Sequence, residues 1–437
     1  MKYPNLNHKK IGIWGFGIVG QSVLQFLKNY PCSISIMDKK QRPETLHSAI
    51  TWIVQTPENI TTFLTNHDLI IPSPGIILHD YAEYTEKFVH ELDIFTSLFT
   101  GYNIAITGTF GKTTVTSFLA QCIPNAKAAG NIGHAMLDAI LDPLVILELS
   151  SYQLHYAQNF APDLAIWTNF APNHLDHHRD TAEYFAAKCN LLKHQNTNQI
   201  TLLPAEIWTD ITKIIHVKSK IFLFSLQSIN TNQPLFTVIN NQIVLQEQNK
   251  LTVIFNDITQ LPKTTFLINW IVILAALHLS KLQPLSLLDR ITTIQAEPHR
   301  LELVTTKNGI KFFNDSKSTL WQTTQYALDQ FPNQRIALFV GGLSKGLDRS
   351  PLMQYAQNKP ITIFNFGAEA ETLANFCKKY NVAHNTAGTL EQALNQCHAI
   401  INQFDVILFS PAGSSFDLFK DFAHRGNEFK RLIQAMF

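Results

Sequence analysis

The chain has 437 residues, of which 46% are hydrophobic and 15% are charged. This composition is too apolar for a disordered chain, and the length suggests about three domains of roughly 150 residues each. Lys and Arg number 34 against 33 Asp and Glu, so the formal net charge of +1 lacks the basic excess of a dedicated nucleic-acid-binding protein.

Cysteine usage and hydropathy indicate where the protein works. Its five cysteines are dispersed without CxxC pairs, as expected for reduced thiols in the cytoplasm. The polar start of the chain has no signal-peptide pattern. The apolar segment 266–279 is too short to cross about 30 Å of hydrocarbon and contains Asn269 and His278. We therefore expect a buried helix there, and no membrane insertion.

Short apolar strands alternate with helical patterns in three stretches, which is typical of parallel α/β sheets. The first stretch has predicted strands at 11–13 and 34–37, separated by a glycine turn and a helix at 21–28. Predicted strands of the other two stretches lie at 103–107, 144–149, 163–168, 335–340, 361–366 and 406–409. Between residues 221 and 255, two strands joined by Asn240-Asn241 and a third strand predict a small antiparallel excursion in the second domain.

The strongest motif is the loop Gly108-Thr-Phe-Gly-Lys-Thr113, which follows an apolar strand and precedes a helical pattern at 115–121. Glycines allow backbone N–H groups to close around phosphates, and the N-terminus of the helix adds partial positive charge. Lys112 would reach the β- and γ-phosphates of a nucleotide, and the Thr113 hydroxyl would ligate Mg²⁺. The loop is shorter than the usual GxxxxGK[ST] pattern. The alternative is a surface turn before a helix.

A second glycine-rich turn, Gly15-Phe-Gly-Ile-Val-Gly20, follows the first predicted strand and opens a helix. Asp38 stands at the end of the next strand, so the spacing fits a dinucleotide-binding turn. Such a turn holds NAD, a uridine diphosphate sugar or nothing. A further turn, Ser73-Pro-Gly75, ends another strand at the edge where open α/β sheets bind ligands.

Candidate metal ligands follow the phosphate loop in the same predicted domain. Glu148 ends a strand, where a carboxylate can hold Mg²⁺ directly or through water. The run Asn173-His-Leu-Asp-His-His178 offers more ligands, but it lacks cysteines and its carboxylate is a hard ligand, so zinc is disfavoured. A solvent-facing histidine cluster is the alternative.

Two later clusters are rich in cations. Arg300 lies in Glu297-Pro-His-Arg-Leu-Glu302, and Asp315 and Lys317 lie in Asn314-Asp-Ser-Lys-Ser-Thr319. Asp315 can accept hydrogen bonds from a ribose and Lys317 can bind a phosphate, although ordinary solvated turns would have the same composition. The segments 341–346 and 410–415 each follow a predicted strand, again at a ligand-binding edge.

Taken in chain order, the phosphate loop, Glu148–Leu154, Asn173–Asp176, Pro298–Glu302 and Asn314–Lys317 resemble the Mur ligase family of peptidoglycan synthesis. Glu148–Leu154 and the ending Ser410–Phe429 resemble the branch that joins D-glutamate to UDP-N-acetylmuramoyl-L-alanine. The resemblance spans almost the whole chain. It implies an ATP-dependent cytoplasmic ligase that forms an acyl phosphate, uses two Mg²⁺ ions and acts as a monomer.

The resemblance also implies three α/β domains with Rossmann-like and P-loop sheets: residues 1–98 for the UDP-sugar, 99–296 as the ATPase, and 297–437 for the amino acid and part of ATP. It assigns the UDP-sugar to Ile18, Val19, Asp38, Ser73, Gly75 and Asn131. It assigns ATP to Gly108, Thr109, Gly111, Lys112, Thr113, Thr114, Asn269, Arg300, Asp315 and Lys317. D-glutamate is assigned to Thr319, Lys345, Ser415 and Phe422, and the metal ions to Thr113, Glu148, His174 and Lys188. The implied catalytic residues are Lys112, Lys188, His174 and Asn131.

In relatives the lysine that matches Lys188 is carbamylated by CO₂, which turns a cation into an oxygen ligand for Mg²⁺. The alternative is an ordinary exposed helix lysine. Four positions depart from the family pattern: Phe110, Val272 and Leu320 replace common asparagines, and Val19 replaces a common threonine near the diphosphate. With Val272 in place, Asn269 is the expected adenine partner.

Three other functions remain open at this point. A sibling ligase would add another amino acid or act on folate, although the Asp-Asn-Pro-Arg motif of the diaminopimelate branch is absent. A nicotinamide oxidoreductase would use the turn at 15–20 but leave the phosphate loop unexplained. A noncatalytic nucleotide-binding relative would account for Phe110 and Val272.

Overall fold

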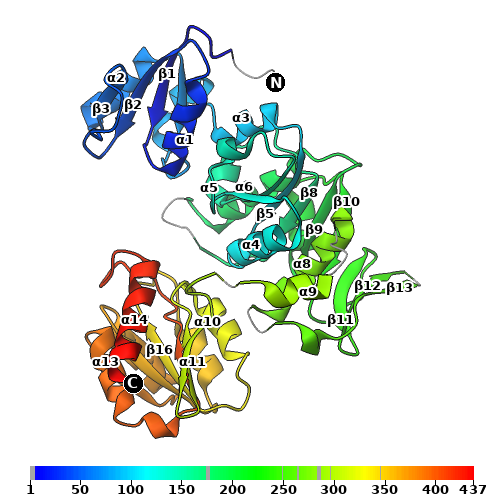
Figure 1. Cartoon of the computed structure of the whole chain (residues 1–437), viewed down its shortest axis with the longest axis vertical. Coiled ribbons are helices and arrows are strands. Elements are labelled where there is room, and N and C mark those ends of the chain that lie inside the picture. The colour runs from blue at the N-terminus through cyan, green and yellow to red at the C-terminus, as the bar shows by residue number, and fades with distance from the viewer. Residues whose placement is uncertain are drawn as a thin grey trace. The chain divides into compact units, whose positions relative to one another are not determined.

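The computed structural model describes residues 5–173, 178–248, 250–262, 265–282, 287–295, 297–344 and 346–437. The chain forms two compact units: unit 1 comprises Met1–Gln260 and Ile271–Ile291, and unit 2 comprises Leu261–Trp270 and Thr292–Phe437. Unit 1 contains a four-stranded and a nine-stranded sheet, and unit 2 contains a six-stranded sheet (Figure 1). The predicted α/β class with parallel-dominated sheets is confirmed.

The first sheet of unit 1 is parallel throughout, in the order β3-β2-β1-β4. Its elements, with 3₁₀ helices labelled η, are β1 (Lys10–Trp14), α1 (Ile18–Leu27), β2 (Ser33–Asp38), β3 (Thr51–Val54), α2 (Pro57–Asn66), β4 (Leu69–Pro72), η1 (His79–Lys87) and α3 (Glu91–Leu98). The turn after β1 requires glycine at two positions. Gly15 has a φ of +91°, and a Cβ on Gly20 would lie 2.1 Å from the Gly15 carbonyl oxygen.

The second sheet of unit 1 has the order β13-β12-β11-β10-β9-β8-β5-β7-β6. Its strands are β5 (Tyr102–Thr107), β6 (Lys127–Gly130), β7 (Leu144–Glu148), β8 (Leu164–Trp167), β9 (Ile200–Pro204), β10 (Lys220–Phe224), β11 (Leu235–Ile239), β12 (Gln242–Glu247) and β13 (Lys250–Phe255). The helices that accompany it in sequence are α4 (Lys112–Cys122), η2 (Met136–Ala139), α5 (Ser151–His155), α6 (Thr181–Lys193), η3 (Ala205–Ile207), α7 (Trp208–Ile214), η4 (Ile258–Gln260), α8 (Leu267–Ser280) and α9 (Leu287–Thr293). β5 lies between β7 and β8, so the phosphate loop leaves the sheet from an interior strand.

The predicted antiparallel excursion is confirmed but begins later than residue 221. β10 pairs in parallel with both β9 and β11, whereas β11–β12 and β12–β13 are antiparallel pairs. The turn between β11 and β12 places Asn240 and Asn241 at φ +49° and +60°, the left-handed conformation that a two-residue hairpin requires.

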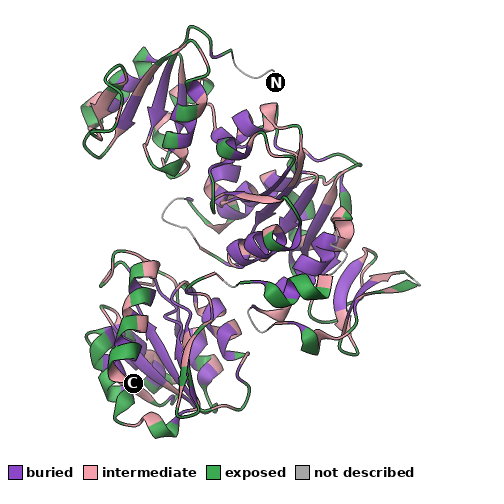
Figure 2. Cartoon of the chain, in the orientation of Figure 1, coloured by how far each residue is buried: buried purple, intermediate pink, exposed green. Residues whose placement is uncertain are grey.

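The two sheets of unit 1 share one continuous apolar core, which includes Ile11 and Ile13 of β1, Phe95 of α3 and Val145 of β7. The strands carry much of this burial (Figure 2). A hydrogen bond from Ser22 Oγ to Asp138 Oδ1, 2.5 Å long, joins α1 to η2. A common core of this kind fixes the carboxyl ends of β1 and β4 relative to those of β5 and β7.

Unit 2 contains one six-stranded sheet in the order β14-β15-β19-β16-β17-β18. Its elements are β14 (Glu302–Lys307), β15 (Ile310–Asn314), α10 (Trp321–Leu328), β16 (Ile336–Gly341), α11 (Ser350–Ala356), β17 (Ile361–Phe366), α12 (Ala370–Lys379), β18 (His384–Ala387), α13 (Leu390–His398), η5 (Ile401–Gln403), β19 (Val406–Phe409) and α14 (Phe422–Met436). β14 and β15 form an antiparallel hairpin that the sequence analysis missed. The other pairs are parallel.

The apolar segment at 266–279 forms helix α8, as predicted. Its residues from Trp270 to Leu277 are all buried. None of the helices in the described residues combines the length and the apolar character that a membrane span requires.

Candidate active site

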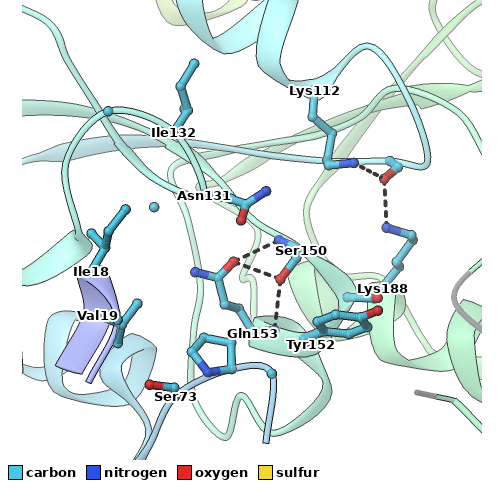
Figure 3. Close-up of a pocket in the computed structure, with 17 residues that line it drawn as sticks. Ile18, Val19, Ser73, Lys112, Asn131, Ile132, Ser150, Tyr152, Gln153 and Lys188 are labelled. Atoms are coloured by element: carbon cyan, nitrogen blue, oxygen red, sulfur yellow. Dashed lines mark hydrogen bonds between the residues drawn. The ribbon is translucent and has the colours of Figure 1, made fainter. Parts of the chain in front are cut away.

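Unit 1 contains a cavity of about 550 Å³ that opens at the carboxyl ends of strands from both of its sheets (Figure 3). This edge is where open α/β sheets bind ligands. The lining residues are Gly17, Ile18, Val19, Ser73, Pro74, Gly75, Gly108, Lys112, Gly130, Asn131, Ile132, Gly133, Ser150, Ser151, Tyr152, Gln153 and Lys188. The cavity therefore combines residues predicted for the UDP-sugar with residues predicted for the triphosphate.

The phosphate loop has the predicted order of strand, loop and helix, with α4 beginning at Lys112. Two glycines make its path possible. Gly108 has a φ of +151°, where a Cβ would lie 2.0 Å from Thr168 Oγ1. Gly111 caps α4 in the left-handed conformation, with a φ of +79°. The alternative of a plain surface turn is wrong, because the loop and the first turn of α4 are largely buried.

Asn169 holds the phosphate loop, and the sequence analysis did not identify it. Its Oδ1 accepts hydrogen bonds from the backbone N–H groups of Thr109 and Phe110, at 3.2 and 3.0 Å. Its Nδ2 donates to the Phe110 carbonyl at 2.8 Å, and Thr168 Oγ1 donates to the same oxygen at 2.7 Å. Since Phe110 takes part through its backbone, replacement of the family asparagine leaves this framework intact. The Phe110 side chain is half-buried and is not among the described residues that line the cavity.

Lys112 and Lys188 converge on one backbone oxygen (Figure 3). Lys112 Nζ donates to the Gly108 carbonyl at 2.8 Å and to the Thr109 carbonyl at 3.0 Å. Lys188 Nζ donates to the same Gly108 carbonyl at 2.9 Å and to Thr107 Oγ1 at 3.3 Å. Both amines therefore lie at the first residue of the phosphate loop.

Lys188 is 1% exposed, so the alternative of an ordinary exposed helix lysine is wrong. Its amine lies 4.8 Å from the centre of the Tyr184 ring. Burial lowers its pKa well below the usual value for lysine, the charge of Lys112 lowers it further, and Glu148 opposes both effects. This burial was not evident from the sequence, because the buried residues of α6 lie on several of its faces and do not form a single apolar stripe.

Glu148 ends β7 as predicted, and its two carboxylate oxygens have different surroundings. Oε1 accepts a hydrogen bond from Asn131 Nδ2 at 3.1 Å. Oε2 is buried and, among the described residues, has no hydrogen-bond partner. A buried, unpaired carboxylate oxygen beside a phosphate loop suits a hard divalent cation such as Mg²⁺. Thr113 is buried in the first turn of α4.

The residues predicted for the UDP-sugar are divided between the cavity and its support. Ile18, 71% exposed, lines the cavity with Val19, Ser73, Gly75 and Asn131. Asp38 is not among the lining residues. Its carboxylate accepts the backbone N–H groups of Phe16 and Lys40 at 2.6 and 2.8 Å, and so holds the glycine turn in place.

The remaining predicted site residues lie in unit 2 or outside the described residues. His174 and Lys345 lie outside the described residues. In unit 2, Asn269 and Ser415 are buried and Thr319 is exposed. Lys317 Nζ lies 5.2 Å from the centre of the Phe422 ring.

Asp315, predicted for ATP, is buried in a network of hydrogen bonds within unit 2. Its carboxylate accepts from Ser318 Oγ at 2.6 Å, Ser410 Oγ at 2.7 Å and the backbone N–H of Leu301 at 3.1 Å. Burial raises its pKa to about 6, although these hydrogen bonds and the charge of Arg300 oppose the rise.

Arg425 supports the same region, and the sequence analysis missed it. This fully buried guanidinium on α14 donates to Ser316 Oγ, the Ser316 carbonyl and the Gly413 carbonyl, at 3.0, 2.7 and 2.9 Å. Burial lowers its pKa to about 10, against the attraction of Asp417 and Asp315. It therefore joins the loops after β15 and β19, which carry Asp315, Lys317 and Ser415.

Two family models match the chain. The model of the Mur ligase middle domain matches residues 106–259, and that of the Mur ligase MurD-like N-terminal domain matches residues 9–85. The UDP-N-acetylmuramoylalanine–D-glutamate ligase of Lawsonia intracellularis is 30% identical over 98% of this chain and 94% of the relative. The enzyme of that name from Ruminiclostridium cellulolyticum is 28% identical over 99% of this chain and 98% of the relative.

Solved structures share the fold at lower identity. A MurF structure from Acinetobacter baumannii has a TM-score of 0.60 at 14% identity and covers 98% of this chain and 91% of its own. MurF ligase from Thermotoga maritima in complex with ADP has a TM-score of 0.56 at 15% identity, with 99% and 95% covered. The motifs, the fold and these matches over almost the whole chain show that the chain belongs to the Mur ligase family, among the UDP-N-acetylmuramoylalanine–D-glutamate ligases.

Proposed function

We propose that this protein is an ATP-dependent ligase that joins the amine of D-glutamate to the carboxylate of UDP-N-acetylmuramoyl-L-alanine, releasing ADP and phosphate. The observation that supports it most is the cavity of unit 1, where Ile18, Val19 and Ser73 face the same space as Lys112 and Lys188. A sugar nucleotide whose diphosphate is bound at the first sheet would direct its terminal carboxylate toward the phosphate loop of the second sheet.

The chemistry requires activation because a free carboxylate is a poor acyl donor. A carboxylate oxygen of UDP-N-acetylmuramoyl-L-alanine attacks the γ-phosphorus of ATP, the bond to the β-bridging oxygen breaks, and ADP leaves. Lys112 and the backbone N–H groups at the start of α4 stabilise the charge on the transferring phosphoryl group. The D-glutamate amine then attacks the acyl phosphate, and phosphate leaves with the former carboxylate oxygen.

Glu148 and Thr113, with His174, are the residues that would hold Mg²⁺. The unpaired Glu148 Oε2 fits this role, because it is a buried anionic acceptor without a donor among the described residues. A bound ion would neutralise part of the phosphate charge. Asn131 orients Glu148 from the side of the cavity.

Lys188 would complete the metal site as a carbamate. The burial of its amine disfavours the charged form, and an uncharged amine is the form that reacts with CO₂. D-glutamate is assigned to Thr319, Lys345, Ser415 and Phe422, where a lysine and two hydroxyls suit a dicarboxylate.

The test is amide formation with a panel of amino acids. We expect purified protein with Mg·ATP and UDP-N-acetylmuramoyl-L-alanine to form a product of the correct mass with D-glutamate. L-glutamate, L-lysine, meso-diaminopimelate and glycine should give none. A product with another member of the panel in place of D-glutamate would refute the specificity, and ATP turnover retained by Lys112→Ala would refute the role of the loop.

A further inference from the structure

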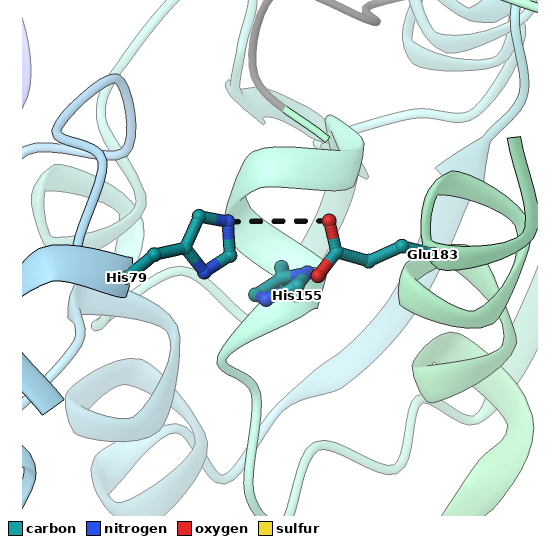
Figure 4. A group of neighbouring side chains, drawn as sticks. All are labelled: His79, His155 and Glu183. Carbon is teal, nitrogen blue, oxygen red and sulfur yellow. Dashed lines mark ion pairs between the residues drawn. The ribbon is translucent and has the colours of Figure 1, made fainter. Parts of the chain in front are cut away.

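A second group of ligand-type side chains lies outside the cavity of unit 1 and has no part in the proposed ligation. His79, His155 and Glu183 point toward one another from three separate segments (Figure 4). His79 begins η1, His155 ends α5, and Glu183 lies in the first turn of α6. One ligand atom from each residue lies within 4.8 Å of the other two. None of the three is among the residues assigned to Mg²⁺.

The geometry suits a single small cation. Ligands at about 2.0–2.2 Å from a tetrahedral zinc ion stand roughly 3.3–3.6 Å apart. His79 Nε2 and Glu183 Oε2 are 3.9 Å apart, so side-chain shifts of well under an ångström would bring them to ligand spacing. His79 Nε2 is buried and has no hydrogen-bond partner among the described residues. The imidazole nitrogen is therefore directed at the carboxylate without a proton acceptor in bonding range.

Glu183 is already oriented for this role. Its Oε2 accepts the backbone N–H of Arg179 at 2.7 Å, and the Arg179 side-chain Nε lies 3.7 Å from Oε1. His178 Nδ1 lies 3.9 Å from Oε2 on another side, while its Nε2 contacts Ser151 Oγ at 2.9 Å. A hydrogen bond that orients a carboxylate is typical of the surroundings of metal ligands. The side chains of His79 and Glu183 are each 21% exposed, so the cluster lies near the surface although His79 Nε2 itself is buried.

The choice of ion follows from the donors. Two imidazoles and one carboxylate favour a borderline transition metal over Mg²⁺, which prefers oxygen ligands and retains its water. Three protein ligands leave a fourth position open for water. The simpler alternative is an ion pair in which Glu183 neutralises a protonated histidine and no metal binds.

We propose that His79, His155 and Glu183 bind one divalent transition-metal ion of the zinc type, which ties together three segments that line the active-site cavity. His79 follows Gly75 by four residues, His155 follows Gln153 by two, and Glu183 precedes Lys188 by five. Each ligand thus shares a segment with a cavity-lining residue. A bound ion would hold the segment after β4 of the first sheet in a fixed position relative to α5 and α6, which contribute other residues to the cavity.

The test measures zinc on the full-length protein, without ATP or sugar nucleotide. Bound metal is first removed with a chelator, and the protein is then dialysed against Zn²⁺ in a large excess of Mg²⁺. The zinc bound per chain is measured by elemental mass spectrometry. We expect about one zinc per chain, and less than a tenth of that in His79→Gln and in Glu183→Gln. His216→Gln, which changes an exposed histidine outside the cluster, is the matched control and should retain the ion.

Thermal unfolding separates loss of the site from loss of the fold. Without metal, the variants should unfold at the wild-type temperature, and Zn²⁺ should raise the midpoint of the wild type and of His216→Gln only. Full zinc binding by His79→Gln would place the ion on other ligands, such as the histidines at 174–178, and would overturn the proposal. So would a wild type that retains no zinc, as the ion-pair alternative requires.

Discussion

Replacement of Asn169 by alanine tests whether the phosphate loop is held in shape from outside its own motif. The substitution removes two acceptor bonds from the N–H groups of Thr109 and Phe110 and one donor bond to the Phe110 carbonyl. At about 1 kcal/mol for each net hydrogen bond, the ordered loop loses roughly 2–3 kcal/mol relative to disordered alternatives. Because each 1.4 kcal/mol corresponds to a factor of ten, kcat/KM for ATP should fall roughly 30- to 150-fold.

The assay is ADP release at varied ATP concentration, with UDP-N-acetylmuramoyl-L-alanine and D-glutamate saturating. The control is Asn103→Ala, which removes a side-chain hydrogen bond to Asp163 Oδ2 at the amino end of β5, the end opposite the loop. Asn103→Ala should leave KM for ATP within about twofold of wild type, whatever it does to stability. If Asn169→Ala behaves in the same way, the loop does not depend on this side chain and the reasoning fails.

Three further substitutions probe the glycine turn, a buried carboxyl and the buried amine. Gly20→Ala places a Cβ against the Gly15 carbonyl oxygen and should lower the free energy of unfolding, measured by chemical denaturation, by about 1–3 kcal/mol. Gly17 has open space around it, so Gly17→Ala should change the free energy of unfolding by less than about 1 kcal/mol. Burial raises the pKa of Glu91 to about 7, so between about pH 4.5 and 7 the folded state keeps a proton that the unfolded state has lost. The free energy of unfolding of the wild type should therefore fall with rising pH in that window, by up to ~1.4 kcal/mol per pH unit. Glu91→Gln should make the free energy of unfolding less dependent on pH there. Equal slopes for wild type and Glu91→Gln would contradict a buried neutral carboxylic acid at Glu91. Lys188→Met keeps the packing but removes the amine, and should lower kcat roughly 100-fold with little change in the unfolding temperature; unchanged turnover would exclude Lys188 from the site.

The parts of the fold and site that were predictable are those carried by contiguous residues. The loop at 108–113 could be placed between a strand and a helix because glycine, lysine and threonine stand in one short run. The hairpin at Asn240-Asn241 was predictable because two adjacent residues suited to positive φ separate two strands. Glu148 could be placed at the end of a strand by the apolar run before it.

The missed features depend on contacts between distant segments. Asn169 contacts residues 59 and 60 positions earlier in the chain, and nothing in its own neighbourhood marks it except its place just after a strand end. Arg425 reaches a residue 109 positions away, and an arginine in an amphipathic helix ordinarily suggests a solvent-exposed side chain. The edge strand β14 was missed because four of its six residues are polar and none is buried, unlike the apolar runs of the parallel strands.

The most direct test of the proposed chemistry follows one oxygen atom. UDP-N-acetylmuramoyl-L-alanine labelled with ¹⁸O in both carboxylate oxygens is ligated with Mg·ATP and D-glutamate, and the released phosphate is analysed by mass spectrometry. Transfer of the γ-phosphoryl group to the carboxylate predicts one ¹⁸O in each phosphate, since the amine expels phosphate together with a carboxylate oxygen. Phosphate without ¹⁸O would contradict the acyl phosphate and with it the role assigned to the loop that carries Lys112.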